Sequence, residues 1–198
     1  MSKLHDLEKD TWSNKRDVRR YYNTIASAYT ELYGKEQLLK YRAAFKYLST
    51  TGEAILDLGC GTGLLFSFIS TQSLLVGIDL SSQMVRHAAR RICAYPEGHV
   101  ICADADYLPL RGSIFNTVFA FTLLQNIGTP QNLLQEVSRV LKNNSTFILS
   151  VLKSVFHGDE ILKRLRHSHL QVTTWHSTTS KDVLVICKKV TFYSKDTR

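Results

Sequence analysis

The stretch "ILDLGCGTGLL", Ile55 to Leu65, places three glycines at alternate positions directly after an apolar run that contains one aspartate. A short apolar run closed by glycine is typical of a buried parallel strand. Glycine lacks a Cβ, so Gly59, Gly61 and Gly63 let the chain turn sharply from a strand into a helix and let a ligand approach the backbone. The N–H groups at the start of that helix suit an anionic or strongly accepting group. The stretch therefore predicts a ligand-binding loop.

The next apolar run, "LLVGID", ends in Asp79, about 20 residues after Gly59. At this spacing in a doubly wound sheet, a carboxylate accepts hydrogen bonds from ribose hydroxyls, which predicts a nucleoside ligand. The dinucleotide fingerprint has two residues between its second and third glycines, whereas Thr62 alone stands there. A pyrophosphate cradle is therefore disfavoured. The competing interpretation is a tight turn without a ligand, with Asp79 capping the helix that follows.

Length and composition set the broad class. The chain has 198 residues, 44% of them hydrophobic, which is enough for one compact domain. Its net charge of +8 favours anionic partners, although Lys and Arg are scattered along the chain. The four cysteines lie far apart without a C-x-x-C pair, and no secretory leader precedes them, so we expect a reduced, cytoplasmic protein. The apolar runs are too short to span a membrane, and no membrane association is expected.

Hydrophobic periodicity predicts strands that alternate with helices, hence a mostly parallel sheet covered on both faces. Two leading helices are expected between residues 18 and 48, separated near Gly34, after a frayed polar segment. Ser81 is expected to cap one helix, and Thr129 with Pro130 to begin another. Strands are expected at 54–59, 74–79, 100–104, 115–124, 146–152, 170–177 and 182–190, and the other helices at 64–70, 81–93, 130–142 and 159–167.

Three motifs in order, "ILDLGCGTG", "GIDLS" and "ADADYLPL", resemble those of the class I S-adenosylmethionine-dependent methyltransferases. Within that class the chain is most similar to the small methyltransferase-domain group, whose members often begin with an aromatic helix such as "YYNTIASAYTELY". The resemblance implies a Rossmann-like, doubly wound, seven-stranded sheet with an antiparallel last strand. It also implies a flexible tail at 1–17, one methyltransferase domain at 18–192 with a helical lid at 18–50, and a tail at 193–198.

The resemblance further implies S-adenosylmethionine as the cofactor and assigns roles by motif position. The glycine loop would surround the methionine part, Asp79 would bind the ribose, and Leu80 and Met84 would flank the adenine. Asp104 and Ala105 would lie along the adenine edge, and Phe121 would border the sulfonium. The implied cofactor-binding residues are Tyr21, Tyr29, Asp57, Gly59, Cys60, Gly61, Thr62, Gly63, Asp79, Leu80, Met84, Asp104, Ala105 and Phe121.

Each of these assignments competes with a structural role. Asp104 is also a natural turn cap, and Met84 and Phe121 are common core residues. The tyrosines of the leading helices pack as readily as they bind a ligand. The histidines lack the spacing of metal ligands, and no metal is predicted. No catalytic residue is assigned, because methyl transfer from a sulfonium needs chiefly in-line positioning of the nucleophile.

The acceptor is the open question. The segment "FAFTLLQNIG", 119–128, lacks the Asn/Asp-Pro-Pro-aromatic motif of enzymes that methylate base amines or glutamine amides. Three hypotheses remain: an enzyme acting on a small molecule or a macromolecular side group, an RNA-directed enzyme, and a non-catalytic cofactor-binding partner of another protein. The basic segments "NKRDVRR" and "KRLRHSH" favour RNA, although a solvated helix face is the commoner explanation of such clusters. The oligomeric state is left open.

Overall fold

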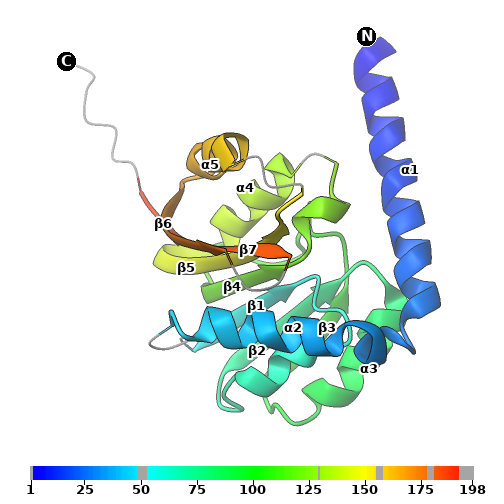
Figure 1. The fold of residues 1–198 in the computed structure, drawn as a ribbon, viewed down its shortest axis with the longest axis vertical. Helices are drawn as coiled ribbons and strands as arrows, with labels where there is room; N and C mark the ends of the chain where they lie inside the picture. Colours follow the sequence, from blue (N-terminus) through cyan, green and yellow to red (C-terminus); the bar gives the residue numbers. More distant parts are fainter. Residues whose placement is uncertain (1, 49–52, 129, 155–157, 178–180, 192–198) are drawn as a thin grey trace.

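A seven-stranded sheet forms the centre of the protein (Figure 1). The computed structural model describes residues 2–48, 53–128, 130–154, 158–177 and 181–191, with side chains from residue 13 onward. The strand order is β3-β2-β1-β4-β5-β7-β6, and only β7 runs antiparallel to its neighbours. This confirms the predicted architecture. The strands are β1 (Ala54–Leu58), β2 (Leu74–Asp79), β3 (Gly98–Cys102), β4 (Phe115–Phe121), β5 (Leu141–Leu152), β6 (Leu170–Ser177) and β7 (Asp182–Lys189).

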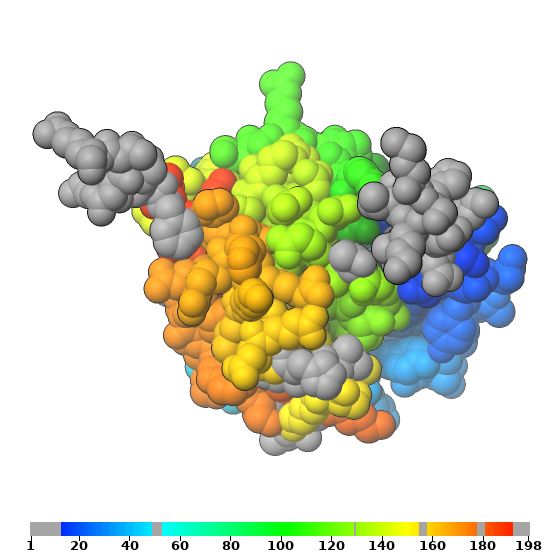
Figure 2. Space-filling view, turned by 90° about the horizontal axis from the view of Figure 1, so that it is seen from above, coloured from blue at the N-terminus to red at the C-terminus, as the bar shows by residue number. Residues whose placement is uncertain are grey.

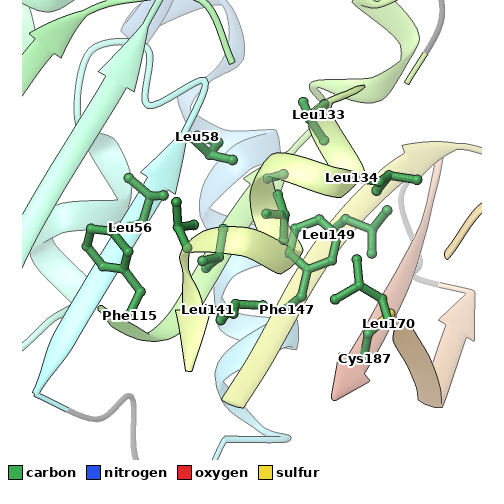
Figure 3. Packing of buried hydrophobic residues seen from close by; sticks show 14 of the residues in the cluster. Leu56, Leu58, Phe115, Leu133, Leu134, Leu141, Phe147, Leu149, Leu170 and Cys187 are labelled. Atoms are coloured by element: carbon green, nitrogen blue, oxygen red, sulfur yellow. The ribbon is translucent and has the colours of Figure 1, made fainter. Parts of the chain in front are cut away.

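Helices cover both faces of the sheet because the strands bury side chains on both sides. On β1, Leu56 and Leu58 belong to the apolar cluster that includes the helix α4 (Gln131–Val140) and Leu165 of α5 (Gly158–His167). Ile55 points to the opposite cluster, which joins α2 (Tyr29–Phe45), η1 (Leu64–Phe68) and α3 (Ser82–Ile92). Figure 3 shows leucines of α4 packed over β1 and β5. Since β1 is buried along its whole length, it fixes the ligand loop that follows it.

The leading helices differ from the prediction in their bounds. The first, α1, runs from Ser2 to Ile25, so it begins well before Val18. The break falls at 26–28 rather than near Gly34, which is buried inside α2. A single glycine costs a helix interior only about 1 kcal/mol, and the packing of α2 on η1 compensates for this. Figure 1 shows α1 along one side of the domain. The division into tails 1–17 and 193–198 and one domain remains a prediction.

Three other helices, α3, η1 and α4, can be compared with the helix starts predicted from the sequence. Ser81 caps α3 as predicted, its hydroxyl accepting a hydrogen bond from the Met84 N–H at 3.1 Å. The sequence predicts a helix at 64–70 whose first N–H groups could bind an anion. The structure has only the five-residue 3-10 helix η1 there. Pro130 stands at the start of α4, whereas the Thr129 cap lies outside the described residues. Among the described helices, none has the length and apolar character needed to cross a membrane.

Candidate functional site

One pocket opens at the carboxyl ends of β1, β2 and β4 and is roofed by α1. Parallel strands place their carboxyl ends on one edge of the sheet, which is where doubly wound folds bind ligands. The lining residues are Lys15, Val18, Arg19, Tyr22, Tyr29, Gly59, Gly61, Ile78, Asp79, Leu80, Ser81, Met84, Ala103, Asp104, Ala105, Phe121, Thr122, Leu123, Asn126 and Ile127.

Asp79 stands at the end of β2 with its carboxylate fixed from two sides. One oxygen accepts a hydrogen bond from the Gly61 N–H at 2.9 Å, and the other accepts one from the Ser81 N–H at 2.8 Å. Burial raises the pKa of Asp79, and these two N–H groups partly counter it. Each carboxylate oxygen has a second lone pair, so the fixed group can also accept bonds from a pair of ligand hydroxyls. The predicted role of Asp79 toward a ribose remains a prediction.

The glycine loop is shaped by residues in the left-handed region. Gly59, Gly61 and Gly63 have φ values of 68°, 54° and 79°, which disfavour any residue with a Cβ. The N–H groups of Gly59 and Cys60 both bond to the Ile78 carbonyl oxygen, at 2.8 and 3.0 Å. These bonds tie the loop to β2 beside Asp79. Gly59 and Gly61 therefore present bare backbone to the pocket.

Four predicted residues support the loop from behind and do not line the pocket. Asp57 is buried in β1, and burial raises the pKa of its carboxyl group well above the usual range. Cys60 is buried, and the Thr62 hydroxyl lies 3.1 Å from that of Thr30 on α2. At Gly63, an added Cβ would meet the Phe66 ring at 2.6 Å. Their positions are those of packing residues.

The acidic segment after β3 meets a lysine from α1. The Lys15 ammonium lies 2.6 Å from a carboxylate oxygen of Asp104 and 2.5 Å from one of Asp106. Asp104 and Ala105 line the pocket as predicted, but Asp104 shares its charge with this lysine. The turn-cap interpretation also holds, since the second Asp104 oxygen accepts from the Asp106 N–H at 3.0 Å.

Tyr22, rather than the predicted Tyr21, is the tyrosine of α1 that lines the pocket. Tyr21 is 51% exposed, and its hydroxyl lies 3.3 Å from that of Tyr33. The Tyr22 hydroxyl accepts a hydrogen bond from the Asn126 amide at 3.1 Å, and burial raises its pKa. Tyr29 lines the pocket as predicted, and burial raises its pKa strongly. Tyr21 and Tyr22 are adjacent, so the sequence alone does not fix which of them faces the pocket, and the cofactor role of Tyr21 remains a prediction.

The remaining walls are mostly apolar. Leu80, Met84 and Phe121 line the pocket as predicted, with Met84 only 1% exposed. The predicted lid at 18–50 includes Val18, Arg19 and Tyr22, but sequence reasoning named only Tyr21 on this helix and placed Lys15 in a tail. The usable signal was helical spacing, since Val18 and Tyr22 lie four residues apart and share one helix face. The other lining residues absent from the prediction are Lys15, Arg19, Ile78, Ser81, Ala103, Thr122, Leu123, Asn126 and Ile127.

Comparisons with known proteins identify a methyltransferase domain in this chain. A family model described as "Methyltransferase domain" matches residues 55–144. An uncharacterized protein of Methanocaldococcus jannaschii is 30% identical over 138 residues, which are 69% of this chain and 52% of that protein. A malonyl-[acyl-carrier protein] O-methyltransferase of a Marinomonas species is 27% identical over 143 residues, 71% of this chain and 53% of that enzyme. The chain thus spans about half the length of the curated relatives it matches.

A solved structure extends the likeness to the fold. Magnesium protoporphyrin IX methyltransferase from Synechocystis, crystallised with bound S-adenosylmethionine, superimposes with a TM-score of 0.72. The match covers 89% of this chain and 97% of that one at 19% identity. At this identity the likeness concerns the fold alone.

Proposed function

We propose that the chain, whose residues 55–144 match the methyltransferase-domain family model, is a class I S-adenosylmethionine-dependent methyltransferase that binds S-adenosylmethionine under α1 and transfers the methyl group to an acceptor. The observation that carries the proposal is the Asp79 carboxylate, held by the N–H groups of Gly61 and Ser81 in the pocket wall. A fixed, partly buried acceptor at the end of β2 suits the two hydroxyls of a ribose.

The other pocket residues fit the remaining parts of such a ligand. Leu80 and Met84 offer apolar surface to an adenine, and Asp104 offers a carboxylate to the amine at its edge. Gly59 and Gly61 leave room for the chain that carries the sulfur. When bound, the cofactor supplies a methyl group on a positively charged sulfur. The protein's part is to orient the two reactants and to keep water out under α1.

Calorimetry with S-adenosylmethionine, S-adenosylhomocysteine and NAD tests the cofactor. We expect the first two to bind and NAD to bind far more weakly, because a third glycine spaced for a pyrophosphate is missing. NAD binding as tight as that of S-adenosylhomocysteine would refute the proposal. Incubating cell extract with methyl-labelled cofactor and identifying labelled products by mass spectrometry would name the acceptor. Cofactor binding without any labelled product would favour a non-catalytic partner protein instead.

An RNA acceptor is the second candidate, and the surface of α1 favours it. Arg16 and Arg19 are exposed and form no ion pair within the described part of the chain. They line an open groove with Arg20, Asn23 and others, and Arg19 also lines the main pocket. Phosphates held in this groove would lie at the pocket mouth.

The second basic segment does not extend this groove. Residues 163–167 belong to α5, on the side of the molecule opposite the blue residues of α1 (Figure 2). An RNA-directed enzyme should bind transfer RNA with an affinity that falls steeply with salt. Arg16→Gln with Arg19→Gln should weaken that binding and flatten the salt dependence. Binding that is unaffected by both substitutions would exclude this groove as an RNA site.

A further inference from the structure

Thr122, directly after β4, has a backbone conformation that is costly for its residue type. Its φ is 54°, in the left-handed region, which β-branched residues rarely adopt. The backbone is held there because the Thr122 N–H bonds to the carbonyl oxygen of Ser150 at 3.1 Å and to its hydroxyl at 2.9 Å. Glycine or asparagine would adopt this φ more readily. Such strain is found where a side chain is needed for function.

The Thr122 hydroxyl contacts a lysine that is almost completely buried. Lys40 of α2 is 1% exposed, and its ammonium lies 2.5 Å from Asp182 and 2.8 Å from Glu36. Its third contact is with the Thr122 hydroxyl oxygen, at 2.9 Å. An ammonium has three protons and no lone pair, so Lys40 can only donate to Thr122. The Thr122 oxygen therefore accepts from Lys40, and the Thr122 hydroxyl proton is left to be donated to another group.

The hydrogen bonds of the Thr122 hydroxyl can be counted. Its oxygen accepts from Lys40 at 2.9 Å, and the Gln37 amide nitrogen lies farther away, at 3.5 Å. Neither contact uses the hydroxyl proton, which can bond elsewhere. Among the described residues, the other hydroxyl near it is that of Ser150 at 3.3 Å, where either oxygen can donate, and this distance is long for an O–H···O bond. An oxygen in the pocket at about 2.8 Å would be the better acceptor.

The Gln37 side chain supplies a second sign of an incomplete network. Gln37 is 5% exposed, yet its amide oxygen has no hydrogen-bond partner among the residues described. A buried acceptor without a donor costs free energy and is uncommon in folded proteins. Thr122 lines the pocket directly. The polar cluster of Gln37, Lys40, Thr122, Ser150 and Asp182 thus ends at the pocket wall.

The strand order indicates which of the two reactants, the cofactor or the methyl acceptor, lies next to the polar cluster at Thr122. Asp79 and Asp104 follow β2 and β3, on one side of β1, so the nucleoside belongs there. The glycine loop follows β1 itself, and Thr122 follows β4 on the other side. A group lying over β4 is therefore across the reactive centre from the nucleoside.

We infer that Thr122, held by Lys40, donates a hydrogen bond to an oxygen of the methyl acceptor and orients that acceptor for transfer. The inference rests on the proposed function and adds a substrate class to it: a molecule with a carbonyl or carboxylate oxygen at or beside the methylated atom. Thr122 contacts the substrate, whereas Lys40 is a positioning residue that acts through Thr122.

The test compares Thr122→Val, which keeps the shape and removes the hydroxyl, with Thr122→Ser, which keeps the hydroxyl. Label transfer from methyl-labelled cofactor is measured against increasing amounts of cell extract as the acceptor source. We expect Thr122→Val to raise the half-saturating amount of extract about tenfold or more, and Thr122→Ser to restore it. Calorimetric affinity for S-adenosylhomocysteine should stay within about twofold in both variants, since the nucleoside end is untouched.

Two further variants separate binding from structure. Thr122→Ala removes the hydroxyl with less backbone strain and serves if the valine variant does not fold. Ser150→Ala keeps the Thr122 hydroxyl but removes one of the two acceptors that hold the Thr122 N–H, so it measures how much of any loss comes from the position of the Thr122 backbone. A loss in Ser150→Ala equal to that in Thr122→Val would show a structural role and overturn the inference.

Three other outcomes of these measurements would overturn the inference. Normal half-saturation in Thr122→Val overturns the inference and leaves the proposed function intact. Weaker binding of S-adenosylhomocysteine with unchanged binding of 5′-methylthioadenosine would assign the hydroxyl to the cofactor's amino-acid part, which also overturns it. If the wild-type protein binds S-adenosylhomocysteine but labels nothing in the extract, both the proposed activity and the acceptor site fail together.

Discussion

The ammonium of Lys15 lies 2.6 Å from a carboxylate oxygen of Asp104, across 89 residues of sequence. It lies equally close to Asp106, whose side chain is only 4% exposed. Burial lowers the pKa of Lys15, but hydrogen bonds and charge from the two aspartates outweigh it and raise the pKa overall. The ammonium is thus the charged link that holds α1 across the mouth of the pocket.

Replacing this lysine should loosen the roof of the pocket. Lys15→Met removes the ion pairs that link α1 to the segment after β3 and leaves Asp104 and Asp106 without their cation, so α1 is held less firmly over the pocket. We expect the dissociation rate of S-adenosylhomocysteine to rise about tenfold, because losing an ion pair to a partly buried carboxylate costs about 1.5–3 kcal/mol. Stopped-flow release of the ligand measures this.

Arg20→Met is the matched control for that substitution. Arg20 is exposed, and among the described side chains its one ion pair is with Asp17 on its own helix, at 3.4 Å, so its loss should change the release rate little. Equal effects of the two substitutions would mean that helix charge in general, and not the Lys15 contact, holds α1.

Ligand binding should slow hydrogen exchange in α1 more than in α2. Lys15, Val18, Arg19 and Tyr22 of α1 line the pocket, whereas Tyr29 is the one lining residue of α2. Much of α2 is anchored already by buried Lys40 and its pairing with Asp182. Exchange measured by mass spectrometry with and without S-adenosylhomocysteine should therefore show protection over residues 13–25 and a small change over 37–45. Protection that is equal in both helices would mean that they move as one lid.

The sheet could be predicted from the sequence because its signals are local. Apolar runs predicted all seven strands, although β5 begins at Leu141, five residues before its predicted start, and the central strands were clearest because a strand buried on both faces needs continuous apolar sequence. The role of Asp79 as a fixed acceptor followed from spacing. Lys15 and Thr122 could not be found in this way. Lys15 becomes a pocket residue only through a long-range ion pair, and the strain at Thr122 depends on contacts from β5.

Gly61 and Gly63 should differ in how strongly an alanine substitution destabilises the protein. Gly63→Ala places a Cβ 2.6 Å from the Phe66 ring and 3.3 Å from the Ala88 Cα, in addition to the backbone strain. Gly61→Ala adds the strain alone, because its Cβ would lie 3.7 Å from Tyr29. We expect Gly61→Ala to cost about 1–2 kcal/mol of unfolding free energy and Gly63→Ala to cost more. Urea unfolding compares them, and equal losses would contradict the packing argument.

Removing the Asp79 carboxylate should weaken cofactor binding directly. Asp79→Ala deletes the acceptor assigned to the ribose hydroxyls, and we expect a loss of about 1.5–3 kcal/mol in the calorimetric affinity for S-adenosylhomocysteine. Glu97→Ala, an exposed acidic position before β3, is the control and should bind normally. Since Asp79 also holds the Gly61 and Ser81 N–H groups, thermal unfolding must first show that the variant is folded. Unchanged affinity in a folded variant would exclude Asp79 from the ribose site.

Glu136 on α4 should make stability depend on acid pH. Hydrogen bonds from Arg139 lower the pKa of Glu136 from its ordinary value of 4.5, although burial opposes them, and the Leu108 N–H adds a bond at 2.7 Å. A carboxylate whose pKa is lower in the folded state stabilises it above the unfolded pKa, and this contribution is lost as pH falls through the folded pKa. Urea unfolding of wild type and Glu136→Gln should therefore differ by about 1 kcal/mol at about pH 7. The difference should shrink as the pH falls below 4.5. A difference that stays constant down to about pH 3 would show that packing, and not the charge of Glu136, stabilises this contact.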